Sequence, residues 1–215
     1  MKRLLLIAVL GGMLLLGLSL LVPGFSALVF GSRPDGLQSG DIIFQNSRST
    51  QSDAIRRATH SPWTHMGIVI YRNGNPYVLE AAATVRMTPF RSWIRRGAGG
   101  HYVAKRLKKG GPRIDGATLT RVHGLVGRYL RKDYDLAFEW SDERMYCSEL
   151  VWKIYMRAAG IKIGDLQAMS SLDLSDPVVQ AKLRERYGDH VPLDQPVITP
   201  AAMFESPLLE EVKRR

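Results

Sequence analysis

The sequence contains almost no cysteine: Cys147 is the only one among 215 residues. A single thiol cannot form an internal disulfide, and it cannot supply the several sulfur ligands of a multi-cysteine zinc or iron–sulfur site. Both classes of protein are therefore excluded, and no metal or other cofactor is expected. A lone thiol suits either a catalytic nucleophile or a small buried side chain.

Acidic residues are also in the minority, with 20 Asp and Glu against 30 Lys and Arg, which gives a net charge of +10. This balance excludes an acidic calcium-buffering protein and favours an anionic partner such as nucleic acid, anionic lipid or an anionic wall polymer. The sequence lacks a dense basic stripe interleaved with aromatics, a zinc-finger spacing and an obvious helix-turn-helix. Nucleic acid is therefore not an expected partner.

The first 32 residues have the pattern of an export leader. Lys2 and Arg3 precede residues 4–22, a stretch without a single charged side chain. A basic start followed by an apolar run is typical of an export signal, and the basic end is expected to stay in the cytoplasm. The run approaches the length of about 20 residues that spans a bilayer, so a cleaved signal and a membrane anchor both remain open. We expect a leader helix over 1–32 and a domain over 33–215, periplasmic or anchored to the inner membrane facing the periplasm.

The exported body begins with strand-like runs and continues with helical patterns, which predicts one α+β domain with an antiparallel sheet and packed helices. The strands are predicted at 41–44, 65–71, 77–82, 84–87 and 101–107, and the helices at 52–58, 118–130, 147–159 and 177–187. A Gly-rich loop is expected around Gly99. From Val191 onward the chain carries four prolines and is predicted to wrap over the body as an extended arm.

Cys147 stands at or near the start of a predicted helix. Unpaired backbone N–H groups and the helix dipole favour a thiolate there, and the same N–H groups could hold an oxyanion during acyl transfer. Two alternatives remain open. Cys147 also lies on the apolar stripe of its helix and could be a buried core residue, and a helix beginning near Ser141 would place it more than one turn inside.

His65 is the histidine best placed to act as a base, because it opens a strand directly after a turn. If Asn73 and Gly74 form a two-residue hairpin turn, Glu80 becomes the diagonal neighbour of His65 on the same face, with about 7–8 Å between their α-carbons. A three-residue loop would instead put Glu80 on the opposite face. Glu80 could also be an ordinary polar residue on the solvent side of a half-buried strand.

Several short motifs together resemble a known family. They are Gly40-Asp41-Ile42-Ile43-Phe44, Ala58-Thr59-His60, Thr64-His65-Met66-Gly67, Tyr77-Val78-Leu79-Glu80-Ala81, Tyr134-Asp135 and Tyr146-Cys147-Ser148-Glu149-Leu150-Val151. In this order they resemble the YiiX/YebB-like group of circularly permuted papain-like cysteine hydrolases, within the NlpC/P60 superfamily. The resemblance runs from about residue 37 to 207, nearly the whole predicted domain.

The resemblance implies a permuted papain-like fold in which Cys147 is the nucleophile, His65 the base and Glu80 the group that orients it. It also suggests that Tyr146 and Ser148 shape the oxyanion or substrate side of the site. The implied activity is a thiol-dependent hydrolase of the amidase or peptidase type, acting on amide bonds of peptidoglycan peptides or of N-acyl lipids. An acyltransferase or thioesterase acting on lipid acyl groups, and a non-enzymatic module that binds lipid or wall fragments, are the alternatives. The leader would supply contact with the membrane.

Overall fold

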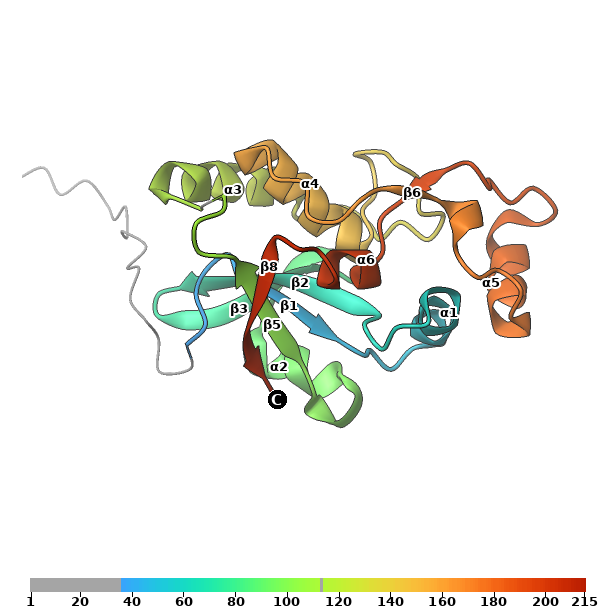
Figure 1. Ribbon diagram of the computed structural model, residues 1–215, viewed down its shortest axis with the longest axis horizontal. Coiled ribbons are helices and arrows are strands. Elements are labelled where there is room, and N and C mark those ends of the chain that lie inside the picture. Colours follow the sequence, from blue (N-terminus) through green and yellow to red (C-terminus); the bar gives the residue numbers. More distant parts are fainter. Residues whose placement is uncertain (1–35, 113) are drawn as a thin grey trace, which may run out of the picture.

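A six-stranded antiparallel sheet forms the centre of the molecule (Figure 1). The computed structural model describes residues 36–112 and 114–215. The predicted leader over 1–32 lies outside the described residues. Within the described part of the chain, no helix is both long and apolar enough to cross a membrane.

The main sheet has the strand order β4-β3-β2-β1-β5-β8. Its strands are β1 (Ile42–Gln45), β2 (His65–Arg72), β3 (Asn75–Ala81), β4 (Val85–Pro89), β5 (Val103–Leu107) and β8 (Leu209–Arg214). The helices are α1 (Thr50–Thr59), α2 (Phe90–Arg96), α3 (Gly116–Tyr129), α4 (Cys147–Ala159), α5 (Pro177–Tyr187) and α6 (Pro200–Phe204). A second sheet pairs β6 (Gln167–Ala168) with β7 (Pro196–Val197), and short 3-10 helices span Ala98–Gly100 and Met169–Ser171.

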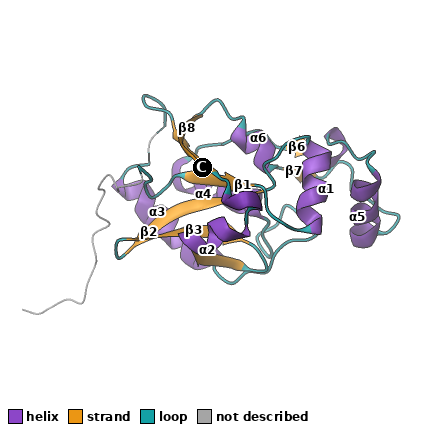
Figure 2. Ribbon diagram, turned by 90° about the horizontal axis from the view of Figure 1, so that it is seen from below, coloured by secondary structure: helices purple, strands orange, loops and turns teal. Residues whose placement is uncertain are grey.

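Both faces of the sheet are covered by helices, as Figures 1 and 2 show. Along β2, Ile68 belongs to the larger core on the α3 and α4 side, whereas the next residue, Val69, belongs to a second core on the α2 side. Successive side chains of a strand point to opposite faces, so a strand buried on both faces reads as a continuous apolar run. The domain is therefore α+β, as predicted.

The hairpin between β2 and β3 has the predicted two-residue turn. Asn73 and Gly74 have φ angles of 47° and 79°, which is the left-handed pair that this turn type requires. Arg72 pairs with Asn75, and the register continues without a shift to Ile68 opposite Leu79. This is the register that places Glu80 on the same face of the sheet as His65, so that prediction is confirmed.

Glycine at position 67 lets the two strands of this hairpin lie close together. A β-carbon on Gly67 would lie 2.5 Å from the carbonyl oxygen of Leu79 and 2.5 Å from a methyl carbon of Val78. Both distances are too short for any real side chain. Gly67 is two residues from His65 on the same face, so the space it leaves helps to bring β3 within reach of the histidine.

Helix α4 begins at Cys147 and not near Ser141. Tyr146 is its N-cap, with an extended backbone, and the Glu149 side chain accepts a hydrogen bond from the Tyr146 N–H at 3.3 Å. The helix ends at Gly160, whose left-handed φ of 69° closes it as predicted. The thiol therefore stands at the first helical position.

Two expectations were incomplete or wrong. Helix α2 was not predicted, because it has only seven residues and no side-chain cap, although Phe90, Trp93 and Ile94 are buried at helical spacing. The tail is not simply an extended arm: it forms β7, α6 and β8, and β8 pairs with β5 at the edge of the sheet. Pro200 occupies the first turn of α6, where a proline lacks no hydrogen bond. Strand β8 pairs with the backbone groups along the edge of β5, which would otherwise be unpaired.

Candidate active site

His65 and Glu80 form a direct hydrogen bond between adjacent strands. The Nε2 atom of His65 lies 2.6 Å from Oε2 of Glu80. His65 is the first residue of β2 and Glu80 lies next to the last residue of β3, so the antiparallel pairing brings together two residues 15 positions apart. Since Glu80 engages Nε2, the other ring nitrogen, Nδ1, is the one left to exchange a proton with another group.

Glu80 is fully buried, and both of its carboxylate oxygens are hydrogen-bonded. Its second oxygen, Oε1, accepts hydrogen bonds from the Thr88 hydroxyl at 2.5 Å, from Nε of Arg86 at 3.3 Å and from Arg96. Burial alone would favour the neutral acid, but the bond to His65, the Thr88 hydroxyl and the Arg96 charge outweigh it and lower the pKa of Glu80 to about 2. Glu80 is therefore a fixed carboxylate at neutral pH and not a solvent-facing polar residue.

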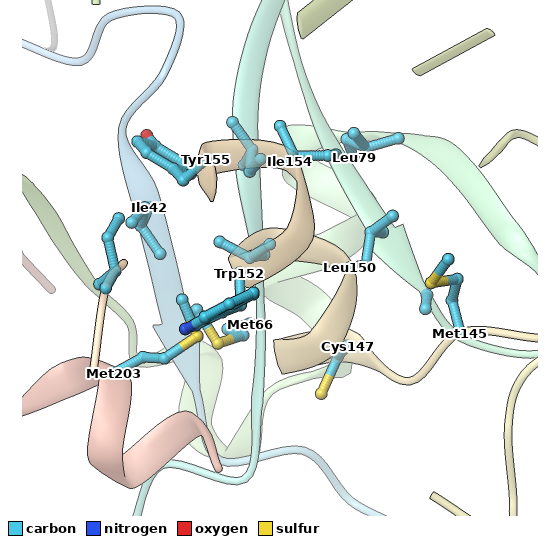
Figure 3. Packing of buried hydrophobic residues seen from close by; sticks show 14 of the residues in the cluster. Ile42, Met66, Leu79, Met145, Cys147, Leu150, Trp152, Ile154, Tyr155 and Met203 are labelled. Carbon is cyan, nitrogen blue, oxygen red and sulfur yellow. The ribbon is translucent and has the colours of Figure 1, made fainter. Parts of the chain in front are cut away.

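Cys147 meets His65 from the opposite side of the sheet. Cys147 is 2% exposed, and its thiol lies close enough to the imidazole to raise the pKa of His65. Figure 3 shows its sulfur at the very start of α4, pointing away from the apolar side chains of the following turns. Burial opposes a charged ring, yet the bonds to Cys147 and Glu80 prevail and raise the pKa of His65 to about 9. The three side chains predicted as catalytic thus lie together, with His65 bonded to Glu80 and next to Cys147.

An aromatic ring also packs on one face of the imidazole. The ring of Trp93 on α2 stacks on that of His65, with centroids 6.0 Å apart and planes at 26°. Gln45 at the end of β1 pairs directly with His65, is fully buried and points towards Gly97, where a β-carbon would come within 2.5 Å of its side-chain oxygen. The position of Trp93 against His65 was missed because the helix that carries it was not predicted, and Gln45 lies one residue beyond the strand predicted over 41–44.

Tyr146 and Ser148 flank the thiol but turn their hydroxyls to the neighbouring segment. The Tyr146 hydroxyl accepts a hydrogen bond from the N–H of Ile198 at 3.1 Å, and the Ser148 hydroxyl donates to the Ile198 carbonyl at 2.7 Å. These bonds fix the start of α4. Among the described residues, the backbone N–H groups of Cys147 and Ser148 lack a helical partner, as expected for the first turn.

Two cavities lie at the site, one lined by Cys147 and the other by His65. One is a mainly apolar pocket of about 720 Å³, including open solvent, that lies against Cys147 between α1 and α5. Its walls include Ala54, Ala58, Leu172, Leu174, Val179 and Leu183. The other is a polar groove of about 1370 Å³, including open solvent, that contains His65.

Tyr134 stands between the two cavities and lines both. Its hydroxyl accepts a hydrogen bond from Nε2 of Gln51 at 2.7 Å, and Gln51 accepts one from Arg186 at 3.0 Å. Burial, together with the nearby Cys147, keeps the pKa of Tyr134 well above its usual value, so the phenol stays neutral. Tyr134 is a site residue to which the sequence alone assigned no role.

The model of one protein family matches residues 36–213, almost the whole described part of the chain. That family is described as the permuted papain-like amidases, YaeF/YiiX, family C92. This chain is a member of family C92. The resemblance seen in the sequence motifs is thereby confirmed, and with it the permuted papain-like fold and the membership of an amidase family.

Two relatives of this C92 chain stand out. It is 46% identical over 200 residues to YiiX of Escherichia coli K12, an uncharacterized protein, and the match covers 93% of this chain and 95% of the relative. It also matches a crystal structure of the metalloprotein YiiX from Escherichia coli O157:H7, with a TM-score of 0.78 and 47% identity. That match covers 83% of this chain and 97% of the other.

The second relative is described as a metalloprotein, which raises the question of a metal site in this C92 member. Within 36–112 and 114–215, no group of three or more His, Cys, Asp or Glu side chains is arranged to hold a metal ion. Cys147 and His65 would supply two ligands, fewer than the three or four of a zinc site, and Glu80 is already engaged. The described residues do not fit a metal ion.

Proposed function

We propose that this protein is a thiol-dependent amidase in which Cys147, His65 and Glu80 act as nucleophile, base and orienting group. The Cys147 thiolate attacks the carbonyl carbon of the amide, and the backbone N–H groups of Cys147 and Ser148 stabilise the oxyanion. His65 then passes its Nδ1 proton to the leaving nitrogen, which departs as an amine. Water, deprotonated by His65, attacks the thioester, releasing a carboxylic acid and restoring the thiol.

The apolar pocket beside the sulfur supports an acyl substrate. Most of its wall residues from α1, α5 and the segment before α5 are aliphatic, and Gln51, Lys182 and Arg186 are the polar exceptions on the two helices besides Thr59. A mainly apolar lining favours hydrocarbon over peptide backbone, whose polar groups would find few hydrogen-bond partners there. Of the two substrate classes, N-acyl lipids therefore fit the site better than the peptide amides of peptidoglycan.

The compartment is part of the same proposal. The apolar stretch over 4–22 and its basic start indicate export, and an enzyme held at the inner membrane would meet acylated substrates there. We propose that the domain faces the periplasm. Fractionation of cells that express the full chain, with protease treatment of spheroplasts, would test this: protection of the domain until the inner membrane is lysed would contradict it.

The decisive experiment incubates purified domain with N-palmitoyl amides and with peptidoglycan fragments and identifies products by mass spectrometry. We expect free palmitic acid and amine from the former, and no product from the Cys147→Ala variant. An acyl product on an added amine or lipid acceptor, in place of free acid, would make the protein an acyltransferase. Turnover that survives Cys147→Ala would refute the thiol mechanism, and the absence of any thiol-dependent product would leave a binding module.

A further inference from the structure

The groove on the His65 side of the thiol differs from the apolar pocket in charge. Its described lining holds three arginines, Arg48, Arg95 and Arg96, against a single acidic residue, Asp133. Arg96 is bound to the buried Glu80. Arg95 is exposed, and its one hydrogen bond to a described residue goes to the hydroxyl of Ser92 at 2.9 Å. Arg48 is also exposed and forms no ion pair with any described residue. Two guanidinium groups are thus available to a ligand.

The position of His65 decides which part of a substrate enters which cavity. His65 lines the groove and not the apolar pocket, whereas Cys147 lines the pocket. In acyl transfer by a thiol, the imidazole that takes part must protonate the leaving group, so the leaving group has to lie on the imidazole side. The acyl chain is then left to the pocket, and the amine portion of the substrate must lie in the groove beside the arginines.

We infer that this groove is a binding site for a negatively charged head group, so that the preferred substrate is an N-acyl amine whose amine portion carries a phosphate or a carboxylate. This inference rests on the proposed amidase function. Planar guanidinium groups match both oxyanions with paired hydrogen bonds, and a wide, open groove admits a bulky polar group. Attraction to the groove would also orient the amide bond with its nitrogen towards His65.

Three substrates that share the palmitoyl chain and the amide test the inference: N-palmitoyl-ethanolamine, its O-phosphate, and N-palmitoyl-glutamate. We expect kcat/KM for at least one anionic amide to exceed that for the neutral amide by about tenfold. That preference should shrink as NaCl rises from about 0.05 M to about 0.5 M. A stronger response to the phosphate would indicate a lipid phosphate as the natural group, and a stronger response to glutamate a peptide-like carboxylate.

The double variant Arg48→Gln, Arg95→Gln should lose most of the ratio of anionic to neutral kcat/KM. Arg91→Gln is the matched control, because Arg91 is an exposed arginine of the same helix α2 that does not line the groove. Arg96 is left intact since it holds Glu80. Equal kcat/KM for the three amides, or a preference that persists in the double variant, would overturn the inference while leaving the amidase function standing.

Binding to the Cys147→Ala variant separates the two proposals. Fluorescent analogues of the three amides should bind with the same order of affinity, tightest for an anionic head group, and the arginine double variant should abolish that order. If no amide is hydrolysed by the wild type, the amidase proposal fails, and this affinity order still decides the head-group site. Equal affinities would refute it.

Discussion

The Glu80 carboxylate holds His65 by its Nε2 atom at 2.6 Å, across the β2–β3 hairpin. The bond leaves Nδ1 for the sulfur of Cys147, which arrives on a helix from the other face of the sheet. A buried carboxylate that fixes the tautomer of an imidazole beside a nucleophile is the arrangement that acyl-transfer chemistry requires.

The first prediction concerns thiol reactivity. A hydrogen-bonded imidazole with a pKa raised to about 9 is protonated at neutral pH and favours a thiolate next to it. We therefore expect iodoacetamide to alkylate Cys147 rapidly at about pH 6.5, where an ordinary cysteine is largely protonated. His65→Ala should slow alkylation at this pH by about tenfold or more. A wild-type profile that rises only above about pH 8 would argue against activation by His65.

The second prediction concerns stability against pH in the Glu80→Gln variant. The pKa of Glu80 is lowered from 4.5 to about 2, so its bonds stabilise the fold fully above 4.5 and are lost as pH falls towards 2. The pKa of His65 is raised from 6.5 to about 9. The stabilisation that protonated His65 gives the fold is therefore complete below pH 6.5 and is lost as pH rises through 9. Urea unfolding should show wild type more stable than Glu80→Gln by roughly 3 kcal/mol at about pH 5.5, with the gap narrowing on both sides.

Glu143→Gln is the control for this comparison, because Glu143 is exposed on the loop before α4 and forms no ion pair among the described residues. It should change the free energy of unfolding by less than about 0.5 kcal/mol at every pH. A gap between wild type and Glu80→Gln that stays constant from about pH 3 to 9 would show that Glu80 is not held as a charged partner of His65.

The third prediction concerns acyl-chain length. Ala58 on α1 lines the apolar pocket, so Ala58→Leu should shorten the space for a hydrocarbon chain. The ratio of kcat/KM for a palmitoyl amide to that for a butyryl amide should fall about tenfold, since each lost methylene contact costs up to about 1 kcal/mol. Ala117→Leu on the exposed side of α3 should leave the ratio unchanged. An unchanged ratio in an Ala58→Leu variant that unfolds normally would place the acyl chain elsewhere.

The fourth prediction treats Trp93 as a positioning residue for His65. Replacing the stacked indole by leucine should let the imidazole turn, lowering kcat by about tenfold with little change in KM, because substrate contacts are untouched. Trp93→Phe keeps an aromatic face and should restore most of kcat. If both variants lose stability and kcat in parallel, Trp93 serves only to fill the core.

The sequence by itself determined the local elements of this site. Asn73 and Gly74 impose a turn with two positive φ angles, and that turn fixes which residues of β2 and β3 share a face. Gly160 and the apolar spacing after Cys147 fix the length of α4. These features depend on backbone preference and on side-chain periodicity, which a single chain reveals without its neighbours.

Only the tertiary structure decided what surrounds those elements. The contact of Cys147 with His65 depends on how α4 lies across the sheet, and the stacking of Trp93 depends on a seven-residue helix with no cap. The pocket between α1 and α5 and the strand β8 at the sheet edge join segments more than 100 residues apart. Such contacts arise from long-range packing and from the burial of shared apolar surface, and local sequence patterns predict neither of them.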